Sequence, residues 1–285
     1  MKKIGISTMC MCDLPPSYLK ENGVEVMQVY VHTASGRFRN ESEITSENVL
    51  EYLASGNVFV KTHVPGPKEC MEYFAELLTR YDEVVHITTS DKIGLSYQNA
   101  KAGVALMGEA AKRVTLIDSC SISSGMGHLV MMAVALRDSG ASVEEIVKEC
   151  EDRRGKISST FIVPNAEYLY RVGYVGEFLK DLCSAFKLHP VLCVRNGRLA
   201  IKSFRVGSYE KAVARYVRSE FRNSEKILKK QLFITHAGCP PRILSWLKTK
   251  VPDLCWFDRI TVTKASAVIA SCCGPETVGL MFLYE

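Results

Sequence analysis

Residues 113–127, RVTLIDSCSISSGMG, carry the clearest signal for the fold of this chain. The apolar run from Arg113 to Ile117 is followed by a serine-rich loop and then by an apolar helical pattern from about Gly125 to Asp138. A short apolar run bounded by turn residues predicts a buried strand, and the longer pattern predicts a helix. This stretch therefore predicts one strand, loop and helix unit of an α/β sheet.

The same alternation continues outward from this unit toward the N-terminus. The sequence predicts strands over residues 3–6, 24–30 and 83–88, and helices over residues 67–80, 96–111 and 143–153. Strands separated by helices of this length favour a doubly wound parallel sheet with helices on both faces. The pattern changes after Gly155, so we expect an N-terminal α/β domain over residues 1–155 and a second domain over residues 156–285.

The second half predicts a C-terminal α/β domain with a mixed sheet. Asn196-Gly197 lies between two apolar runs, and this pair strongly favours a hairpin because both turn positions need positive φ. The expected strands are residues 158–163, 190–194, 198–204, 231–235, 260–262 and 279–284, with helices over 208–221 and 241–250.

The composition is that of a globular protein. The chain has 285 residues, of which 47% are apolar and 24% are charged, and it contains eleven cysteines. An odd number cannot all pair within one chain, which argues against a disulfide framework. No run resembles an export signal or approaches the ~18 apolar residues of a membrane span. We therefore expect a cytoplasmic protein with reduced thiols and no stable membrane insertion.

Three loops that follow predicted strands are rich in hydroxyl groups: Ser7-Thr8, Thr88-Thr89-Ser90, and the loop with Ser119, Ser121, Ser123 and Ser124. In open α/β sheets ligands bind beyond the carboxyl ends of the strands, and helix N-termini there attract anions. These loops would suit an anionic head group. Helix capping and turn formation explain the same residues equally well.

Motifs for most catalytic or cofactor chemistry are absent. The sequence has no Walker A motif, no Gly-x-Gly-x-x-Gly fingerprint and no Gly-x-Ser-x-Gly nucleophile elbow. Cys10-x-Cys12 and Cys272-Cys273 lack the Cys-x-x-Cys spacing of a zinc knuckle. We expect no catalytic residue, no cofactor and no metal, and we expect the scattered histidines to be structural.

The positive charge is regional. Residues 195–230 hold eleven Lys and Arg against three Asp and Glu, a balance of +8, whereas the whole chain carries +5. On the helix predicted over 208–221, Lys211, Arg215, Arg218 and Arg222 share one face, which we call the basic stripe. A solvated face is the ordinary explanation, and a docking surface for an acidic partner is the sharper one. Nucleic acid is not expected, because no binding motif accompanies the stripe.

An ordered set of motifs resembles the DegV family over nearly the whole chain. In the first half these are Ser7-Thr8 with Cys12-Asp13-Leu14-Pro15-Pro16, Thr62 in KTHVPGP, Ile87-Thr88-Thr89-Ser90 with Tyr97-Gln98-Asn99-Ala100, and Asp118-Ser119 with Ser123-Ser124-Gly125-Met126-Gly127. In the second half they are Glu167-Tyr168-Leu169, Lys187-Leu188-His189-Pro190, Asn196-Gly197-Arg198 and Gly274-Pro275-Glu276-Thr277.

The resemblance implies a two-domain lipid-binding protein that is not itself an enzyme. Such a protein holds one long-chain fatty acid, such as palmitate (hexadecanoate), in an apolar tunnel with its carboxylate near the domain interface. It presents this carboxylate to a separate fatty acid kinase, which forms an acyl phosphate for phospholipid synthesis. Docking of the kinase is expected on Lys202, Arg205, Lys211 and Arg215.

The resemblance also implies the head-group site, which this sequence keeps only in part. Thr62 matches the family's threonine, while Gly94 stands where the family has serine and Cys272 where it has histidine. Ser96, Thr89, Ser90 or backbone N–H groups could substitute for the missing donors. Other departures are Met9 for aspartate, Tyr174 for arginine and Glu276 for glycine. The expected ligand-binding residues are Thr62, Gly94, Ser96 and Cys272.

Two alternatives remain open at this stage. The chain could bind a different amphiphile, such as an acyl ester or a neutral lipid, because two head-group donors are replaced. It could instead be a thiol enzyme or metal protein that uses Cys272 or Cys273. A reactive thiol needs a nearby cation or helix N-terminus that lowers its pKa, and the sequence offers no such partner for either cysteine.

Overall fold

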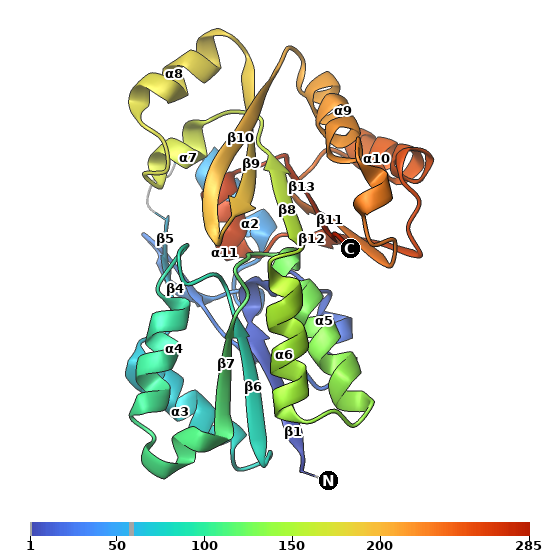
Figure 1. Ribbon diagram of the computed structural model, residues 1–285. Helices are drawn as coiled ribbons and strands as arrows, with labels where there is room; N and C mark the ends of the chain where they lie inside the picture. Colours follow the sequence, from blue (N-terminus) through green and yellow to red (C-terminus); the bar gives the residue numbers. More distant parts are fainter. Residues whose placement is uncertain (1, 57–59) are drawn as a thin grey trace.

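The computed structural model describes residues 2–56 and 60–285, and it contains a parallel sheet built from the first part of the chain (Figure 1). The strand order is β2-β1-β6-β7, and every pairing in this sheet is parallel. The four strands are β1 (Ile4–Met9), β2 (Glu25–Met27), β6 (Glu83–Thr88) and β7 (Val114–Asp118).

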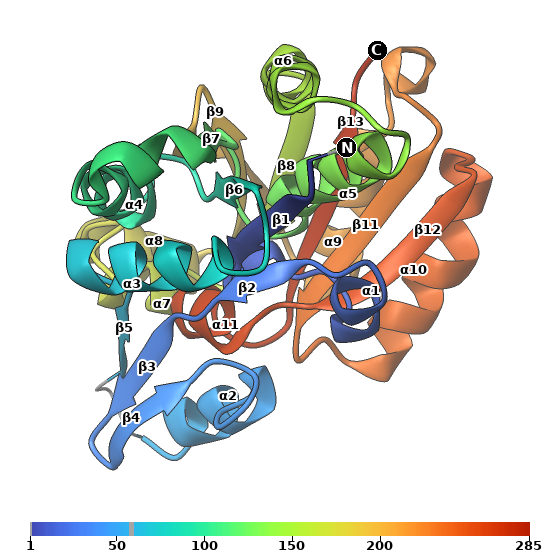
Figure 2. The same ribbon diagram turned by 90° about the horizontal axis from the view of Figure 1, so that it is seen from below.

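Helices cover both faces of this sheet, as a doubly wound arrangement requires. Figure 2 shows α3 and α4 on one face and α5 and α6 on the other. Their bounds are α3 (Pro67–Leu77), α4 (Ser96–Ala105), α5 (Ser124–Asp138) and α6 (Val143–Arg154). The helix expected over residues 96–111 ends at Ala105. An α-helix cannot continue through Gly108, because its φ is 59°, and a 3-10 turn, η2 (Gly108–Arg113), follows.

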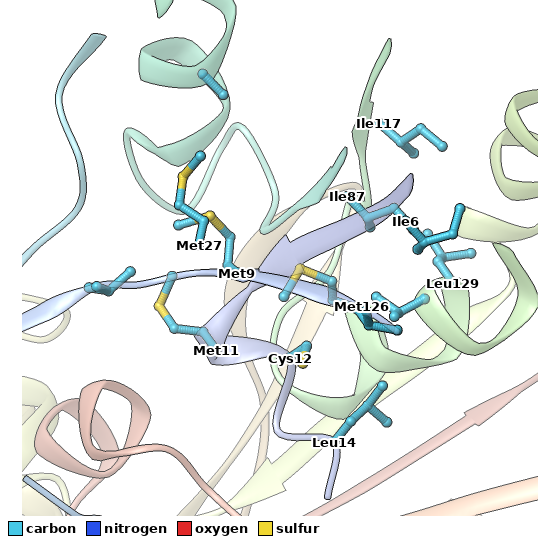
Figure 3. Close-up of a cluster of buried hydrophobic side chains, with 14 of the residues drawn as sticks. Ile6, Met9, Met11, Cys12, Leu14, Met27, Ile87, Ile117, Met126 and Leu129 are labelled. Carbon is cyan, nitrogen blue, oxygen red and sulfur yellow. The ribbon is translucent and has the colours of Figure 1, made fainter. Parts of the chain in front are cut away.

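Burial of apolar side chains between the sheet and α5 forms the core of this half (Figure 3). Ile6 and Ile87 of the sheet and Met126 and Leu129 of α5 are 0% exposed. The same buried cluster includes Phe233 and Met281, which belong to the second half of the chain. The helix α5 therefore packs against both halves of the molecule.

The sequence did not predict a small second sheet in the first half. The strand expected over residues 24–30 is wrong, because it divides into β2 and β3 (Tyr30–Thr33), which lie in different sheets. The small sheet has the order β4-β3-β5, with β4 (Gly36–Arg39) and β5 (Val60–His63). Next to it, α2 (Ser46–Ala54) packs against α11 (Ala267–Cys273), and this contact joins the two halves. A short helix, α1 (Pro16–Glu21), precedes β2.

The second half forms a mixed sheet of six strands in the order β10-β9-β8-β13-β11-β12. Only β11 and β12 pair in parallel. The strands are β8 (Ile157–Ile162), β9 (Leu188–Arg195), β10 (Arg198–Val206), β11 (Gln231–Ala237), β12 (Arg259–Lys264) and β13 (Thr277–Leu283). The predicted hairpin between β9 and β10 is confirmed, since Asn196 and Gly197 have φ of 51° and 76°.

Helices of the second half lie on different sides of this sheet. The amphipathic helices α9 (Tyr209–Glu220) and α10 (Pro241–Leu254) bury Val213, Val217 and Leu247 in a second apolar cluster. The short helix α7 (Glu167–Arg171) packs against α11, whereas α8 (Glu177–Ala185) packs against β9 at the end of the molecule away from the first half (Figure 1). The sequence did not predict the three short helices α7, α8 and α11.

Hydrogen bonds tie the hairpin to the first half. Ser90 Oγ donates to the carbonyl of Gly197 at 2.7 Å, and Lys92 Nζ donates to the carbonyl of Asn196 at 3.0 Å. A Cβ on Gly197 would lie 2.6 Å from Ser90 Oγ, so glycine is needed for this close approach as well as for its φ.

The chain passes from the parallel sheet to the mixed sheet between α6 and β8, and the expected domain boundary after Gly155 stays a prediction. Among the helices described, none is long and apolar enough to cross a membrane. Within residues 2–56 and 60–285, no group of three or more His, Cys, Asp or Glu side chains could hold a metal ion.

Tyr216 offers a test of how the mixed sheet is held together. Its fully buried hydroxyl donates to the Thr160 carbonyl at 2.9 Å and accepts from the Leu280 amide at 3.2 Å. Tyr216→Phe should lower the free energy of unfolding by about 1–3 kcal/mol, because it leaves buried polar groups without a partner. Urea unfolding measures this loss. Tyr18→Phe is the control, because the Tyr18 hydroxyl bonds to no other described residue; equal losses in both variants would contradict the prediction.

Candidate functional site

A cavity of about 310 Å³ lies where the parallel sheet, the small sheet and the mixed sheet meet. Its wall comes from segments spread over the sequence, from Met11 near the start to Gly279 in β13. The volume lies at the lower end of the ~300–1,000 Å³ typical of small-molecule sites.

Most of the wall is apolar. The mixed sheet provides Phe161, Leu192 and Leu199, and α11 provides Val268 and Ile269. The segment around α7 covers the cavity on another side with Leu169, Val172 and Tyr174. An apolar wall of this kind stabilises a hydrocarbon chain by removing it from water.

Several side chains of the lining carry hydroxyl groups. Thr62 comes from β5, Thr89 from the loop after β6, Ser96 from the start of α4 and Ser123 from the residue before α5. Within the described part of the chain, the hydroxyls of Thr62, Thr89 and Ser96 form no hydrogen bond, so they can bind a ligand. The cavity is therefore amphipathic.

The four residues predicted to bind a ligand border this same cavity: Thr62, Gly94, Ser96 and Cys272. They are brought together from three separate parts of the sequence. Their contact with a ligand stays a prediction. Around Gly94 there is open space, since a Cβ built on it would meet no atom within 4 Å.

The two cysteines of α11 line the cavity but lack the chemistry of a nucleophile. Burial raises the pKa of the Cys272 thiol, and burial raises the pKa of Cys273 to about 12. A catalytic or metal-binding thiol needs the opposite shift. Both residues lie at the C-terminal end of α11, where the helix dipole disfavours a thiolate. This geometry argues against the hypothesis of a thiol enzyme.

No Lys or Arg is found among the described residues that line the cavity. The histidine in its wall, His236, is kept neutral near pH 7, because burial and then the charge of Lys264 lower its pKa. Tyr174, which stands where an arginine was expected, borders the cavity and is 44% exposed. A ligand anion here would depend on hydroxyl and backbone donors alone.

Of the two explanations for the three hydroxyl-rich loops, internal hydrogen bonding holds for most of their members. Ser7 is buried against Tyr73 and His86 at 2.8 Å, and Ser121 is 2.8 Å from Ser159. Five more hydroxyls form hydrogen bonds within the protein, namely those of Thr8, Thr88, Ser90, Ser119 and Ser124. Only Thr89 and Ser123 of these loops border the cavity. A hydroxyl residue that follows a strand in the sequence can bond within the protein or face a ligand, and its position in the sequence does not tell which.

The structure places a buried carboxylate, that of Asp13, next to the cavity residue Ser123. The sequence analysis named Asp13 only as part of a family motif. Asp13 follows the 3-10 turn η1 (Cys10–Cys12) and is 5% exposed. Its Oδ2 accepts the hydroxyl of Ser123, and its Oδ1 accepts the backbone N–H of Ser266 at 2.9 Å. The signal in the sequence was a charged residue between two apolar ones, Cys12 and Leu14.

The basic stripe lies away from the cavity. Lys211, Arg215 and Arg218 line an open groove of about 660 Å³ between α9 and α10, together with Arg242 and Trp246. Its charged side chains make this groove unsuitable for an acyl chain.

The other two docking candidates are held by neighbours. Lys202 Nζ lies 2.8 Å from both carboxylate oxygens of buried Glu220, and Arg205 donates to Ser219 Oγ at 2.7 Å. Their role in docking stays a prediction, and their contacts show that both also hold β10 against α9.

Comparison with known proteins gives consistent results over the whole length. The family model described as "Uncharacterised protein, DegV family" matches residues 3–285. A DegV domain-containing protein of Caldanaerobacter subterraneus is 24% identical over 283 residues, with 99% of each chain covered. One from Clostridium acetobutylicum is 26% identical over 228 residues, which is 79% of this chain and 81% of that protein.

Solved structures share the same architecture. A fatty-acid-binding DegV family protein from Thermus thermophilus has a TM-score of 0.88 and 27% identity, covering 99% of this chain and 100% of that one. A DegV family protein from Eubacterium eligens, loaded with heptadecanoic acid, has a TM-score of 0.85 and 16% identity, with 99% and 100% covered. The sheets, the interface cavity and the family match together establish that the chain belongs to the DegV family.

Proposed function

We propose that this protein binds one long-chain fatty acid in the interface cavity and presents its carboxylate to a fatty acid kinase. The observation that carries the proposal is the cavity itself, which combines an apolar wall with a group of free hydroxyls. The fatty-acid-binding relative from Thermus thermophilus supports the same ligand class.

The energetics favour binding through the tail. Burying roughly fifteen methylenes of a palmitate-like chain, at about 0.8 kcal/mol each, contributes about 12 kcal/mol before the costs of ordering. A hydrogen bond to a charged head contributes about 1.5–3 kcal/mol. Gly94 and Cys272 stand in place of two hydrogen-bond donors. The free energy gained by burying the tail still exceeds the free energy lost with these two hydrogen bonds. The altered residues therefore change how firmly the head is held more than whether the ligand binds.

The protein itself acts as a carrier in this proposal. The lining thiols are protonated, and the sequence has none of the phosphate-binding motifs sought above, so phosphorylation of the carboxylate is assigned to a separate kinase. Exposed Thr62 and Gly94 lie where the cavity is open, which would leave a carboxylate accessible for phosphorylation. The basic stripe is the proposed docking surface, and the acyl phosphate would enter phospholipid synthesis.

A second candidate is supported by one observation. The described cavity lining contains no cation, and its histidine is neutral, so an amphiphile with an uncharged head, such as an acyl ester, would be accommodated without burying a charge.

The bound ligand distinguishes these candidates directly. Solvent extraction of gently purified protein, followed by mass spectrometry, should give about one C14 to C18 fatty acid per chain, because tail burial makes release slow. Recovery of an ester or a neutral lipid would favour the second candidate. A protein that is empty and also takes up no added palmitate would contradict both.

Gly94→Ser should strengthen binding of a carboxylate ligand. The space at Gly94 accepts a side chain, and one added hydrogen bond to a charged head is expected to lower the Kd for palmitate about 10-fold or more. Gly94→Ala is the matched control, since it adds the same Cβ without a hydroxyl. Palmitate titrations of both variants give the comparison. If serine and alanine had equal effects, a carboxylate would not lie beside residue 94.

Charge reversal at Lys211 and Arg218 should slow phosphorylation of bound palmitate about 10-fold at low salt while leaving palmitate uptake unchanged. Both side chains are exposed and form no ion pair with another described residue, so the fold should tolerate the change. Arg215 is left intact because its guanidinium donates to the carbonyls of Lys211 and Val206.

The control for this experiment is the double variant Lys20→Glu with Lys101→Glu. It changes the net charge by the same amount on exposed residues of the first half. Equal phosphorylation rates in wild type and in both double variants would remove the basic stripe from the proposed interface.

A further inference from the structure

Ser123 differs from the other hydroxyls of the cavity in its partner. It lines the cavity, it is 1% exposed, and its hydroxyl proton is donated to the carboxylate of Asp13. Its backbone has a φ of 57° and a ψ of −148°, a conformation that non-glycine residues rarely adopt. Backbone strain of this kind persists only where the surrounding structure enforces it.

The hydrogen-bonding capacity of this pair limits what Ser123 can offer a ligand. A serine hydroxyl has one proton, and an ionised carboxylate can only accept. While Asp13 is ionised, the single proton of Ser123 is held by Asp13, and the cavity faces a serine oxygen that repels a carboxylate. Once Asp13 is protonated, it can donate to Ser123, and the serine proton is then free to point at the ligand.

We propose that Ser123 is a head-group donor of the fatty acid site and that Asp13 controls it, so that binding of a carboxylate takes up one proton at Asp13. The proton balance is simple: one proton from solvent joins Asp13, the Ser123 proton turns from Asp13 to the ligand, and no other bond changes. This inference rests on the proposed function and adds its regulation by pH.

The environment of Asp13 agrees with a proton uptake near neutral pH. Burial raises the pKa of Asp13 to about 7, while the hydrogen bonds from Ser123 and Ser266 act in the opposite direction. Within residues 2–56 and 60–285, the carboxylate forms no ion pair. The titratable groups that act on it or respond to it are Glu41 from the loop before α2, Cys10 and Cys12 from η1, and Cys273 from α11.

The sign of the pH dependence follows from this arrangement. Below a pH of about 7 Asp13 is protonated and Ser123 is available, so affinity for a carboxylate is at its full value. Above that pH, binding must first protonate Asp13, and affinity falls up to about 10-fold per pH unit. The test needs a ligand whose carboxylate stays ionised around pH 7. Any change of affinity with pH then comes from the protein and not from titration of the ligand.

Calorimetric titration of delipidated protein with dodecanoate, from pH 6.5 to 8.5, tests the proposal. The Kd should rise about 25-fold over this range, and pairs of buffers with different ionisation enthalpies should show uptake of about one proton per ligand at pH 8.5. Dodecanoate is ionised throughout, since its carboxyl resembles that of a free acid.

Three variants assign the effect. Asp13→Asn keeps the acceptor for Ser266 and a donor for Ser123, so it should bind dodecanoate with no pH dependence and no proton uptake. Ser123→Ala should weaken binding at pH 6.5 about 10-fold and also lose the pH dependence. Glu41→Gln is the matched control; Glu41 accepts from the Ala267 amide outside the cavity lining, and its charge raises the pKa of Asp13. This variant should therefore keep the pH dependence and the proton uptake, with the midpoint moved to lower pH.

Two outcomes are decisive against the proposal. Dodecanoate binding by the wild type that is equally tight at pH 6.5 and 8.5, with no proton uptake, would overturn it while leaving fatty acid binding intact. This wild-type measurement decides the question even if Asp13→Asn does not fold. If dodecanoate bound at no pH, the proposed function itself would fail.

Discussion

The burial of one carboxylate organises the junction between the two halves of this protein. Asp13 gives up hydration in a region of low polarity, which is costly unless the lost water is replaced by hydrogen bonds. Its two oxygens obtain them from the start of α5 and from the residue before α11, which are 110 and 253 positions away in sequence. The first loop, the start of α5 and α11 must therefore hold fixed positions relative to one another, and Met11, Ser123 and Val268 from these segments line the cavity.

Helix α11 depends on this arrangement at its N-terminus as well. Its first amides are bonded to Asn40 and Glu41, which lie between β4 and α2. Acceptors from the first half thus complete a helix that belongs to the second half, and the helix in turn carries Val268 and Cys272 into the cavity. The carboxylate of Glu41 also has a raised pKa, chiefly through burial, so the junction contains two carboxylates in a poorly hydrated place.

Much of the fold could be predicted from the sequence, because long elements have strong periodicity. The strand over Val114–Asp118, the helix over Ser124–Asp138 and the hairpin at Asn196-Gly197 are determined by local pattern and turn chemistry. Short elements such as β5, α7 and α11 were missed, because too few residues repeat and their stability comes from packing against distant segments. At the site, the family motifs pointed to Thr62, Ser96 and Cys272, and all three line one cavity. The pairing of Asp13 with Ser123 could not be predicted, since it depends on which hydroxyl is left over after internal hydrogen bonding.

The wide sequence spread of the cavity lining has a consequence for how the protein is made. Its wall needs Met11 and Gly279 at once, and contacts between such distant residues form late, because closing long loops costs entropy before any packing is gained. During synthesis the apolar wall stays incomplete until β13 has emerged and inserted between β8 and β11. A growing chain therefore has no finished cavity, and insertion of β13 into the middle of the mixed sheet is the step that completes the wall.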